Sequence, residues 1–207
     1  MLSFLREIFG NKKEASTAAM NKYLLVGLGN IGPKYVDTRH NIGFKILDAF
    51  AEAQSLSWET QKLGDVAKLK IKGRPVALLK PNTFMNLSGK AVRYWLNQEN
   101  VKVENLLVVT DDLNLEFGTL RIKGKGSDGG HNGLKDIQAQ LGSTVYPRFR
   151  FGIGDRFNKG KQVDYVLGQW DDAEQADLPE RLDKSVAVLY DFVAAGLNNT
   201  MNTHNGK

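Results

Sequence analysis

The segment GLGNIGPKYVDTRHNIGF, residues 27–44, decides how the rest of the chain is interpreted. It follows KYLLV at residues 22–26, an apolar run typical of a buried strand. Its first six letters fit G-x-G-x-x-G, a dinucleotide-binding turn when a helix begins directly at the glycines. Here Pro33 follows the last glycine, helical periodicity resumes only at Ile42, and the acids about 20 residues on fall within a predicted helix. The pattern therefore favours a long polar loop over a dinucleotide fingerprint.

Beyond this loop the chain alternates strands and helices. Predicted strands cover 22–27, 66–72, 75–80, 105–110, 119–123 and 148–153, and predicted helices cover 41–54, 88–98, 131–141 and 173–197. The first helix places Ile42, Ile46, Leu47 and Phe50 on one face, as expected of a helix packed on a core. Such interleaving predicts an α/β fold, a single domain with a mixed, largely parallel central sheet flanked by helices.

Length and composition narrow the class of protein. The 207 residues suffice for one well-buried domain, and zero cysteines exclude disulfides and thiolate sites. No stretch approaches the ~20 unbroken apolar residues that span a bilayer. Arg6 and Glu7 interrupt the apolar N-terminus, so no export signal is expected and we predict a soluble, cytoplasmic protein without membrane contact. The formal net charge of +5 is compatible with a polyanionic partner without requiring one.

The two ends of the chain differ from the rest. Apolar residues recur at helical spacing between Leu2 and Phe9, stop at Gly10, and give way to polar residues up to Met20. We expect residues 1–19 to be a flexible extension or a misassigned start, and favour this over a docking helix. The remaining residues, 20–207, are expected to form one catalytic domain. The tail NNTMNTHNGK, residues 198–207, is expected to be loose.

Polar side chains follow several predicted strands. The strand at 75–80 leads into PNTFMNLSG, the strand at 105–110 leads into Asp111 and Asp112, and the turn GKGSDGGHNG opens a helix with His131 and Asn132. Open α/β sheets bind ligands in the crevice outside the carboxyl ends of their strands. These loops offer Asn, His and Asp, but no nucleophilic serine motif and no metal-ligand spacing. The pattern indicates hydrolysis by water, a base and neutral hydrogen-bond donors.

Five segments in this order resemble the motifs of the bacterial-type peptidyl-tRNA hydrolases: GLGNIGPKYVDTRHNIGF, KPNTFMNLSGKAV, VVTDDLNLEFG, GSDGGHNGLKDI and RFRFGIG. TFMNLSG and GGHNGLKDI are the most specific. The resemblance implies a peptidyl-tRNA hydrolase-like (phosphorylase/hydrolase-like) fold in a monomeric esterase that uses no cofactor or metal. Its partner would be peptidyl-tRNA, whose ester between the peptide and the 3′ ribose it would cleave to recycle the tRNA. Thr110 and Asn114 depart from the usual His and acid at these positions.

The resemblance also implies three catalytic residues, His40, Asp111 and Asn30. A neutral imidazole, with an ordinary pKa of about 6.5, accepts a proton from the water that attacks the ester. Asp111 would orient that imidazole through its other ring nitrogen, and the register favours it over Asp112. The alternative for His40 is a loop histidine that caps the next helix.

Other residues are implied to bind the substrate. Asn30, Asn86 and Asn132 offer neutral donors and acceptors, although Asn is also common in turns and caps. Asn30 would discriminate N-blocked from free aminoacyl groups. Tyr35 and Phe84 would receive the terminal adenosine by stacking, although Phe84 alone reads as core. His131 is treated as a supporting residue.

The basic residues alternate along two predicted strands. Arg121 and Lys123 share a face, as do Arg148 and Arg150, so the four form one patch if the strands are neighbours. By resemblance, Lys123 and Arg150 would hold a phosphate of the acceptor stem. The alternative is a solvated sheet edge.

Two other functions remain open on sequence grounds. A non-catalytic RNA-binding module is disfavoured because His40, Asp111 and the three asparagines are all present. A nucleotide-dependent oxidoreductase is disfavoured by Pro33, for the reason given above.

Overall fold

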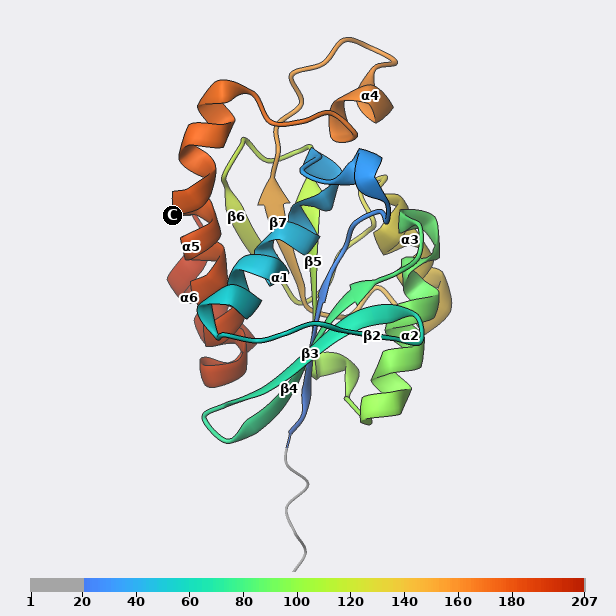
Figure 1. Cartoon of the computed structure of the whole chain (residues 1–207), viewed down its shortest axis with the longest axis vertical. Coiled ribbons are helices and arrows are strands. Elements are labelled where there is room, and N and C mark those ends of the chain that lie inside the picture. The colour runs from blue at the N-terminus through green and yellow to red at the C-terminus, as the bar shows by residue number, and fades with distance from the viewer. Residues whose placement is uncertain (1–20, 207) are drawn as a thin grey trace, which may run out of the picture.

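A seven-stranded sheet runs through the molecule (Figure 1). The structure, a computed structural model, describes residues 21–206, so the expected N-terminal extension at 1–19 lies outside the described residues. The strands are β1 (Tyr23–Gly27), β2 (Glu59–Gln61), β3 (Gly64–Ile71), β4 (Arg74–Pro81), β5 (Leu106–Asp112), β6 (Leu120–Lys123) and β7 (Arg148–Gly152). Their order across the sheet is β2-β3-β4-β1-β5-β7-β6.

The centre of the sheet is parallel and its margins are antiparallel. β4, β1, β5 and β7 pair in parallel, whereas β2, β3 and β6 join through antiparallel pairs. The predicted mixed, largely parallel α/β sheet is therefore confirmed. Parallel strands bring the carboxyl ends of β1, β5 and β7 to one edge of the sheet, the upper edge in Figure 1.

Helices cover both faces of the sheet. They are α1 (Ile42–Ala53), α2 (Ser88–Glu99), α3 (Asn132–Leu141), α4 (Gln162–Val166), α5 (Asp172–Ala195) and α6 (Leu197–His204), with short 3-10 helices η1 (Pro33–Tyr35), η2 (Arg39–Asn41), η3 (Met85–Leu87) and η4 (Val103–Asn105). In β1, Leu25 faces the core beneath α1 and α5, while Leu24 and Val26 face the core beneath α2 and α3. Because both faces are covered, the strand is an unbroken apolar run.

Close packing explains two glycines of the segment at 27–44. A Cβ on Gly27 would lie 2.3 Å from the carbonyl oxygen of Gly43, and a Cβ on Gly43 would lie 2.4 Å from the nitrogen of Leu28. These glycines let the start of α1 approach the end of β1. The first glycine of the pattern therefore serves helix–strand packing, and Pro33 begins a short 3-10 helix instead of a long helix aimed at a phosphate.

Every predicted strand and helix is present, with ends that differ by at most two residues. The sequence analysis missed β2, α4 and α6, which are short. Among residues 21–206, no helix combines the length and the apolar character needed to cross a membrane.

The prediction of a loose C-terminal tail is wrong. Residues 197–204 form α6, and the side chain of Asn205 pairs with the backbone of Ile122 in both directions, at 2.6 Å and 3.0 Å. β6 lies at the margin of the sheet, where the backbone groups of its outer edge need partners. The amide of Asn205 supplies them, which holds the tail against the sheet.

Candidate active site

A cavity opens at the carboxyl edge of the sheet. Its wall combines the carboxyl ends of β5 and β6, the first half of β7, the Gly-rich turn at 124–130, the start of α3, and one side of α4. The polar and charged residues that line it include His40, Asp111, Asp112, Lys123, Lys125, His131, Asn132 and Arg150. Segments that are far apart in the sequence therefore meet at one site, where the sequence predicted a crevice.

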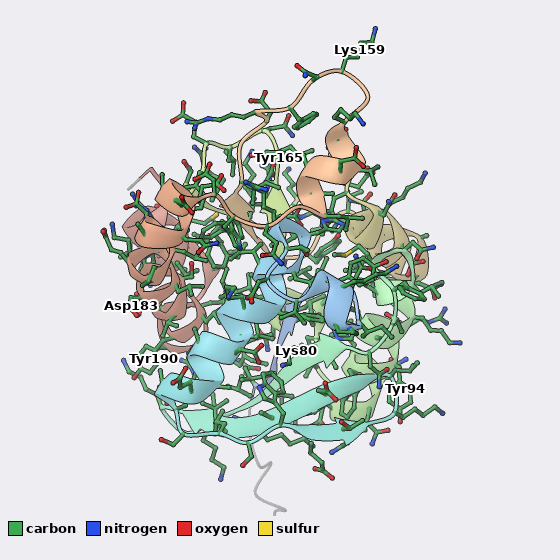
Figure 2. All side chains as sticks on the ribbon, turned by 45° about the horizontal axis from the view of Figure 1, so that its top comes forward. Lys80, Tyr94, Lys159, Tyr165, Asp183 and Tyr190 are labelled. Atoms are coloured by element: carbon green, nitrogen blue, oxygen red, sulfur yellow. The ribbon has the colours of Figure 1, made fainter. Side chains whose placement is uncertain are left out.

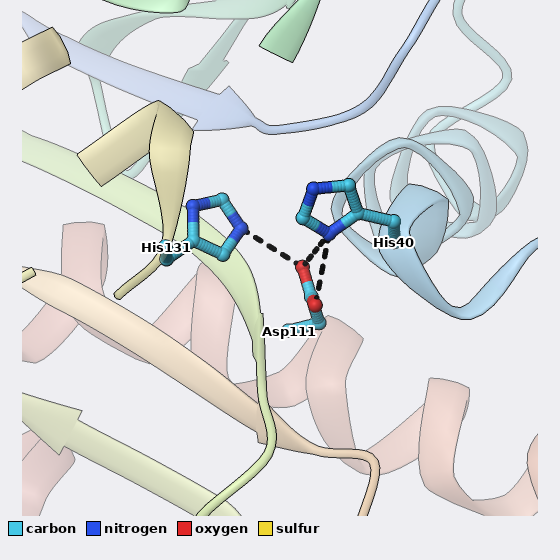
Figure 3. Close-up of side chains that lie close together, drawn as sticks. All are labelled: His40, Asp111 and His131. Atoms are coloured by element: carbon cyan, nitrogen blue, oxygen red, sulfur yellow. Dashed lines mark hydrogen bonds and ion pairs between the residues drawn. The ribbon is translucent and has the colours of Figure 1, made fainter. Parts of the chain in front are cut away.

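Asp111 is the centre of this site (Figure 3). Nδ1 of His40 lies 3.0 Å from each carboxylate oxygen of Asp111, and Nε2 of His131 lies 2.9 Å from Oδ1. The carboxylate is buried at the end of β5, with its side chain 3% exposed, and the His40 side chain is 11% exposed. Of the two adjacent acids, Asp111 is the one that contacts His40, as the register of the predicted strand indicated, and Asp112 pairs with Arg150 instead.

The hydrogen-bond network assigns the protons on both rings. Nδ1 of His131 accepts the backbone N–H groups of Gly133 and Leu134, at 3.1 Å and 3.3 Å, as the N-cap of α3. An imidazole nitrogen that accepts carries no proton, so Nε2 of His131 carries it and donates to Asp111. In the same way, Nδ1 of His40 donates to Asp111. The lone pair of neutral His40 is then on Nε2, the nitrogen that does not contact Asp111.

Burial and charge set the protonation of the pair. Burial alone would raise the pKa of the Asp111 carboxyl, but the attraction and hydrogen bonds of His40 and His131 outweigh it and lower that pKa far below its ordinary value. Burial alone would lower the pKa of His40, but the ion pair and hydrogen bond with Asp111 outweigh it and raise that pKa. Asp111 is therefore ionised, and it stabilises a protonated His40.

The same three side chains have the composition of a metal site, since their ligand atoms lie within 4.8 Å of one another. The proton on His131 argues against that use. A metal on Nε2 would move the proton to Nδ1, where it would face the N–H groups of Gly133 and Leu134. The two imidazole N–H groups are therefore better placed to donate to the Asp111 carboxylate than to leave room for a bound cation.

An asparagine pair closes the first loop. The side chain of Asn41 accepts from the backbone nitrogen of Asn30 at 2.8 Å and donates to its carbonyl at 2.9 Å, while Oδ1 of Asn30 accepts from the nitrogen of Met85 at 2.9 Å. Asn30 thus joins the first loop to the loop after β4, and its oxygen is already engaged. Only its Nδ2 group is left to donate to a ligand. Asn41 was missed by the sequence analysis, which treated it only as the start of a helix.

The asparagines and aromatic residues predicted to bind the substrate do not all line the cavity, and Asn30 is not among the residues that do. Asn132 lines it at the first position of α3, where His131 rather than Asn132 provides the cap. Tyr35, Phe84 and Asn86, all in the described part of the chain, lie outside the set that lines it. Asn86 is exposed in η3, and Phe84 is 51% exposed, so the alternative that Phe84 belongs to the core is wrong.

Close packing links η3 to the start of α3. A Cβ on Gly133 would lie 2.7 Å from the sulfur of Met85, so this glycine allows η3 to approach α3. Asn86 and Asn132 are therefore presented by neighbouring segments. His40 caps no helix, because the N-cap of α1 is Asn41 and the His40 ring contacts Asp111.

The two strands that carry the alternating basic residues, β6 and β7, are neighbours, which was the condition for a single basic patch. Arg121 lies opposite Arg150 and Lys123 lies opposite Arg148 in the β6–β7 pair, so the four share a face. Lys123 is exposed and Arg150 is half-buried, and both line the cavity. Nε of Arg150 is paired with the carboxylate of Asp112.

Arg148 does not join an exposed patch. It is 1% exposed, and its guanidinium donates to the carbonyls of Ser127 at 2.8 Å and Thr144 at 3.1 Å. Those carbonyls draw it inward, where it anchors the Gly-rich turn that leads to His131. The predicted patch of four cations therefore does not include Arg148 as an exposed member.

The two positions that depart from the family pattern have local roles. Thr110 is fully buried, and its hydroxyl donates to the carbonyl of Asp111 at 3.2 Å. The backbone nitrogen of Asn114 donates to the carboxylate of Asp112 at 2.8 Å. Within residues 21–206, neither side chain hydrogen-bonds to His40 or His131; the bonds of both residues are to the last two residues of β5, Asp111 and Asp112.

Comparison with known proteins places this geometry in a family. The model of the family described as peptidyl-tRNA hydrolase matches residues 24–207. The chain is 54% identical over 186 residues to the peptidyl-tRNA hydrolase of Bacteroides fragilis, covering 90% of this chain and 100% of the relative. It is 52% identical over 184 residues to that of Porphyromonas gingivalis, covering 89% and 100%. The crystal structure of peptidyl-tRNA hydrolase from Acinetobacter baumannii superposes with a TM-score of 0.84 at 32% identity, covering 90% of this chain and 96% of that chain. The chain belongs to the peptidyl-tRNA hydrolase family.

Proposed function

We propose that this protein hydrolyses the ester between a peptide and the 3′ ribose of tRNA, with His40 as general base. The observation that carries the proposal is the His40–Asp111 pair, with Nδ1 of His40 held 3.0 Å from the carboxylate at the edge of a cavity. The carboxylate fixes the tautomer, so Nε2 of the neutral ring is free to accept a proton from water.

The reaction follows from this arrangement in two proton transfers. Water attacks the ester carbonyl as its proton passes to Nε2 of His40, which produces an imidazolium stabilised by ionised Asp111. The tetrahedral intermediate then collapses, the bond to the 3′ oxygen breaks, and the imidazolium returns the proton to that oxygen. The products are the peptide with a free carboxyl group and tRNA with a free 3′ hydroxyl.

Neutral amides would bind the acyl group and the developing oxyanion. Asn132 lines the cavity, and Asn86 lies on η3, which packs against the start of α3; these positions support both as candidates. The Nδ2 group of Asn30 is our candidate for contact with the N-blocked end of the substrate. Removing one donor to an oxyanion typically costs ~3–4 kcal/mol of transition-state stabilisation. Exposed Phe84 and half-buried Tyr35 are suited to stack on the terminal adenosine.

Lys123 and Arg150 are proposed to hold a phosphate near the 3′ end. Arg150 uses Nε for Asp112, which leaves its two terminal nitrogens to contact an anion. We expect Lys123→Gln and Arg150→Gln each to raise KM for peptidyl-tRNA and to lower the salt slope by about one unit, because phosphate contacts release counterions. Lys70→Gln is the matched control, because Lys70 is an exposed lysine of β3 that does not line the cavity. An unchanged KM and slope in both cavity variants would contradict the phosphate contact.

The principal test compares two substrates with no added cofactor. We expect release of the amino acid from N-acetylated aminoacyl-tRNA, and little release from the free aminoacyl form. Binding of the blocked substrate without release would instead support a non-catalytic RNA-binding module. A change in absorbance with added NAD would support an oxidoreductase.

We also propose that residues 20–207 act as one catalytic domain and that the protein works as a monomer in the cytoplasm. The proposal of a monomer rests on the family resemblance. The substrate arises at the ribosome, which supports the location. Gel filtration with light scattering tests the first statement, and cell fractionation tests the second.

A further inference from the structure

A buried ion pair lies beside His40 and takes no part in the chemistry described above. Nη2 of Arg39 lies 2.6 Å from Oε2 of Glu174, and both side chains are 9% exposed. Nη1 of Arg39 donates to the carbonyl of Gln169 at 2.5 Å. A buried ion pair seldom stabilises a fold more than apolar residues of the same size would. We therefore looked for a role of this pair other than stability.

Aromatic rings enclose the same guanidinium. It lies 4.4 Å from the ring centroid of Tyr165 and 5.6 Å from that of Trp170. Tyr165, which is labelled in Figure 2, belongs to α4. Its hydroxyl donates to the carbonyl of Ile153 at 2.6 Å, so it also joins α4 to the end of β7. Arg39 thus contacts a segment that includes one wall of the cavity, since Val163 and Val166 of α4 line it.

The backbone around Arg39 is joined to that segment as well. The nitrogen of Arg39 donates to the carbonyl of Gly168 at 3.0 Å, and Thr38 forms an isolated antiparallel bridge with Gln169. Glu174 is itself constrained, because Oε2 also accepts from the nitrogen of Asp171 in the capping box of α5. The partner of Arg39 is therefore fixed at the start of the longest helix.

The three residues of η2 have separate partners. Arg39 binds the segment at 168–174, Asn41 binds the backbone of Asn30, and His40 between them reaches Asp111. A displacement of η2 would move the His40 ring from Asp111, and misplacement by about 1 Å can cost a hundredfold in rate.

From this geometry we infer that Arg39, held by Glu174 and Gln169, is a positioning residue that sets the His40 ring against Asp111 and couples it to the α4 wall of the cavity. The inference rests on the proposed function, because it assigns Arg39 a role through His40. Arg39 does not line the cavity, so the role assigned to it is to position His40.

The test uses two conservative variants of the full chain. Arg39→Lys retains the positive charge but loses the fork that binds Glu174 and Gln169 together. Glu174→Gln retains an oxygen that accepts from both Arg39 and Asp171, and loses only the charge. We expect Arg39→Lys to lower kcat roughly 10- to 100-fold with KM for peptidyl-tRNA within about twofold. We expect Glu174→Gln to lower kcat only a few-fold, about 2 to 5.

A pH profile separates positioning from a merely structural role. The acid limb of kcat/KM reports the pKa of His40, which Asp111 raises. If Arg39→Lys loosens the contact between His40 and Asp111, the pKa of His40 should fall and the acid limb should move to lower pH. Because lysine keeps the positive charge of Arg39, such a shift would not come from a change of charge at position 39. The ionisable groups that face His40 or share its cavity are unchanged in the variant; they are Asp111, Asp112, Lys123, Lys125, Asp128, His131, Arg148 and Arg150.

Asp171→Ala is the matched control for stability. It removes the N-cap of α5, which should lower the melting temperature, and it leaves in place both side chains of the Arg39–Glu174 pair and the backbone nitrogen from which Oε2 of Glu174 accepts. Assays below the melting temperature of every variant should give this control wild-type kcat and an unmoved acid limb.

The inference is overturned if Arg39→Lys keeps the wild-type kcat and limb, or if Asp171→Ala reproduces both changes. If Arg39→Lys does not fold, Glu174→Gln decides through the same two measurements. Failure of the proposed function is distinguishable, because it would appear as a wild-type protein that does not release the peptide, or as full activity in His40→Ala.

Discussion

Two His–Asp pairs in this molecule have similar geometry and different surroundings. Nδ1 of His40 lies 3.0 Å from Asp111 at the cavity, and Nε2 of His204 lies 2.8 Å from Asp191 where α6 meets α5. The carboxylate of Asp111 is 3% exposed, whereas that of Asp191 is 37% exposed. Asp111 also accepts from a second imidazole. A His–Asp contact therefore does not identify a catalytic base by itself; burial of the acid and access of the ring to a cavity are the features that make His40, and not His204, our candidate.

Replacing the histidine of each pair tests this comparison with the largest expected effect. His40→Ala should lower kcat/KM for N-acetylated aminoacyl-tRNA on the order of 10²–10⁴-fold, because it removes the general base. His204→Ala removes a similar hydrogen bond far from the cavity and should leave kcat/KM within about twofold of wild type. Comparable losses in the two variants would mean that His40 acts only through the fold.

The acids of the site provide the next test. Asp111→Asn should lower kcat by about 10²-fold or more, since an amide does not stabilise the imidazolium and allows the wrong tautomer of His40. Asp112→Asn, the matched control one residue later, weakens the pair with Arg150 and the bonds from Asn114 but leaves the His40–Asp111 contact in place, so it should change kcat far less. Single-turnover kinetics on both variants measure the difference. The reverse ranking would contradict the assignment of Asp111.

The second imidazole of the site predicts a change in pH dependence. Asn at position 131 is a favoured N-cap, so His131→Asn should preserve the start of α3 while it removes the donor to Asp111. The charge of Asp111 would then fall on His40 alone and raise the pKa of His40 further. Because the base must be neutral, the acid limb of kcat/KM should move to higher pH, with a loss of kcat of roughly tenfold at neutral pH.

A limb that stays in place in His131→Asn would show that His131 does not share the carboxylate with His40. The expected direction is opposite to that for Arg39→Lys, so the two variants together separate loss of a competing donor from loss of position.

The smallest effect is expected outside the site. Asn205→Ala should lower the free energy of unfolding by about 1–2 kcal/mol, because two backbone groups of Ile122 lose their partner. Activity at 25 °C should stay at the wild-type level. Asn199→Ala, which loses an exposed bond within the same C-terminal region, is the control and should leave the melting temperature nearly unchanged. Equal melting shifts would argue against a specific role for Asn205 at the edge of β6.

Much of the site was predictable because its residues occupy recognisable motifs. His40, Asp111 and Asn132 were named from the sequence, and the structure brings all three to one cavity. Asn30 was also named, but its bond to Met85 was not foreseen. Arg39 and Asn41 were not predicted, although they flank His40 directly. The letters TRHN do not show which of these residues fixes the loop by hydrogen bonds and which contacts Asp111.

By itself the sequence determined the elements of the fold and the family resemblance, since apolar periodicity and motif order are local properties of the chain. Only the tertiary structure decided which polar groups meet. Arg39 and Glu174 are 135 residues apart and Ile122 and Asn205 are 83 apart, and neither contact was predicted. The contact between His40 and Asp111, which are 71 residues apart, was expected only because of the family resemblance. Such contacts leave no periodic signal, because they depend on how the packed sheet and helices bring distant loops together. The physical reason is that burial selects the partners of a polar group, and burial is a property of the folded molecule.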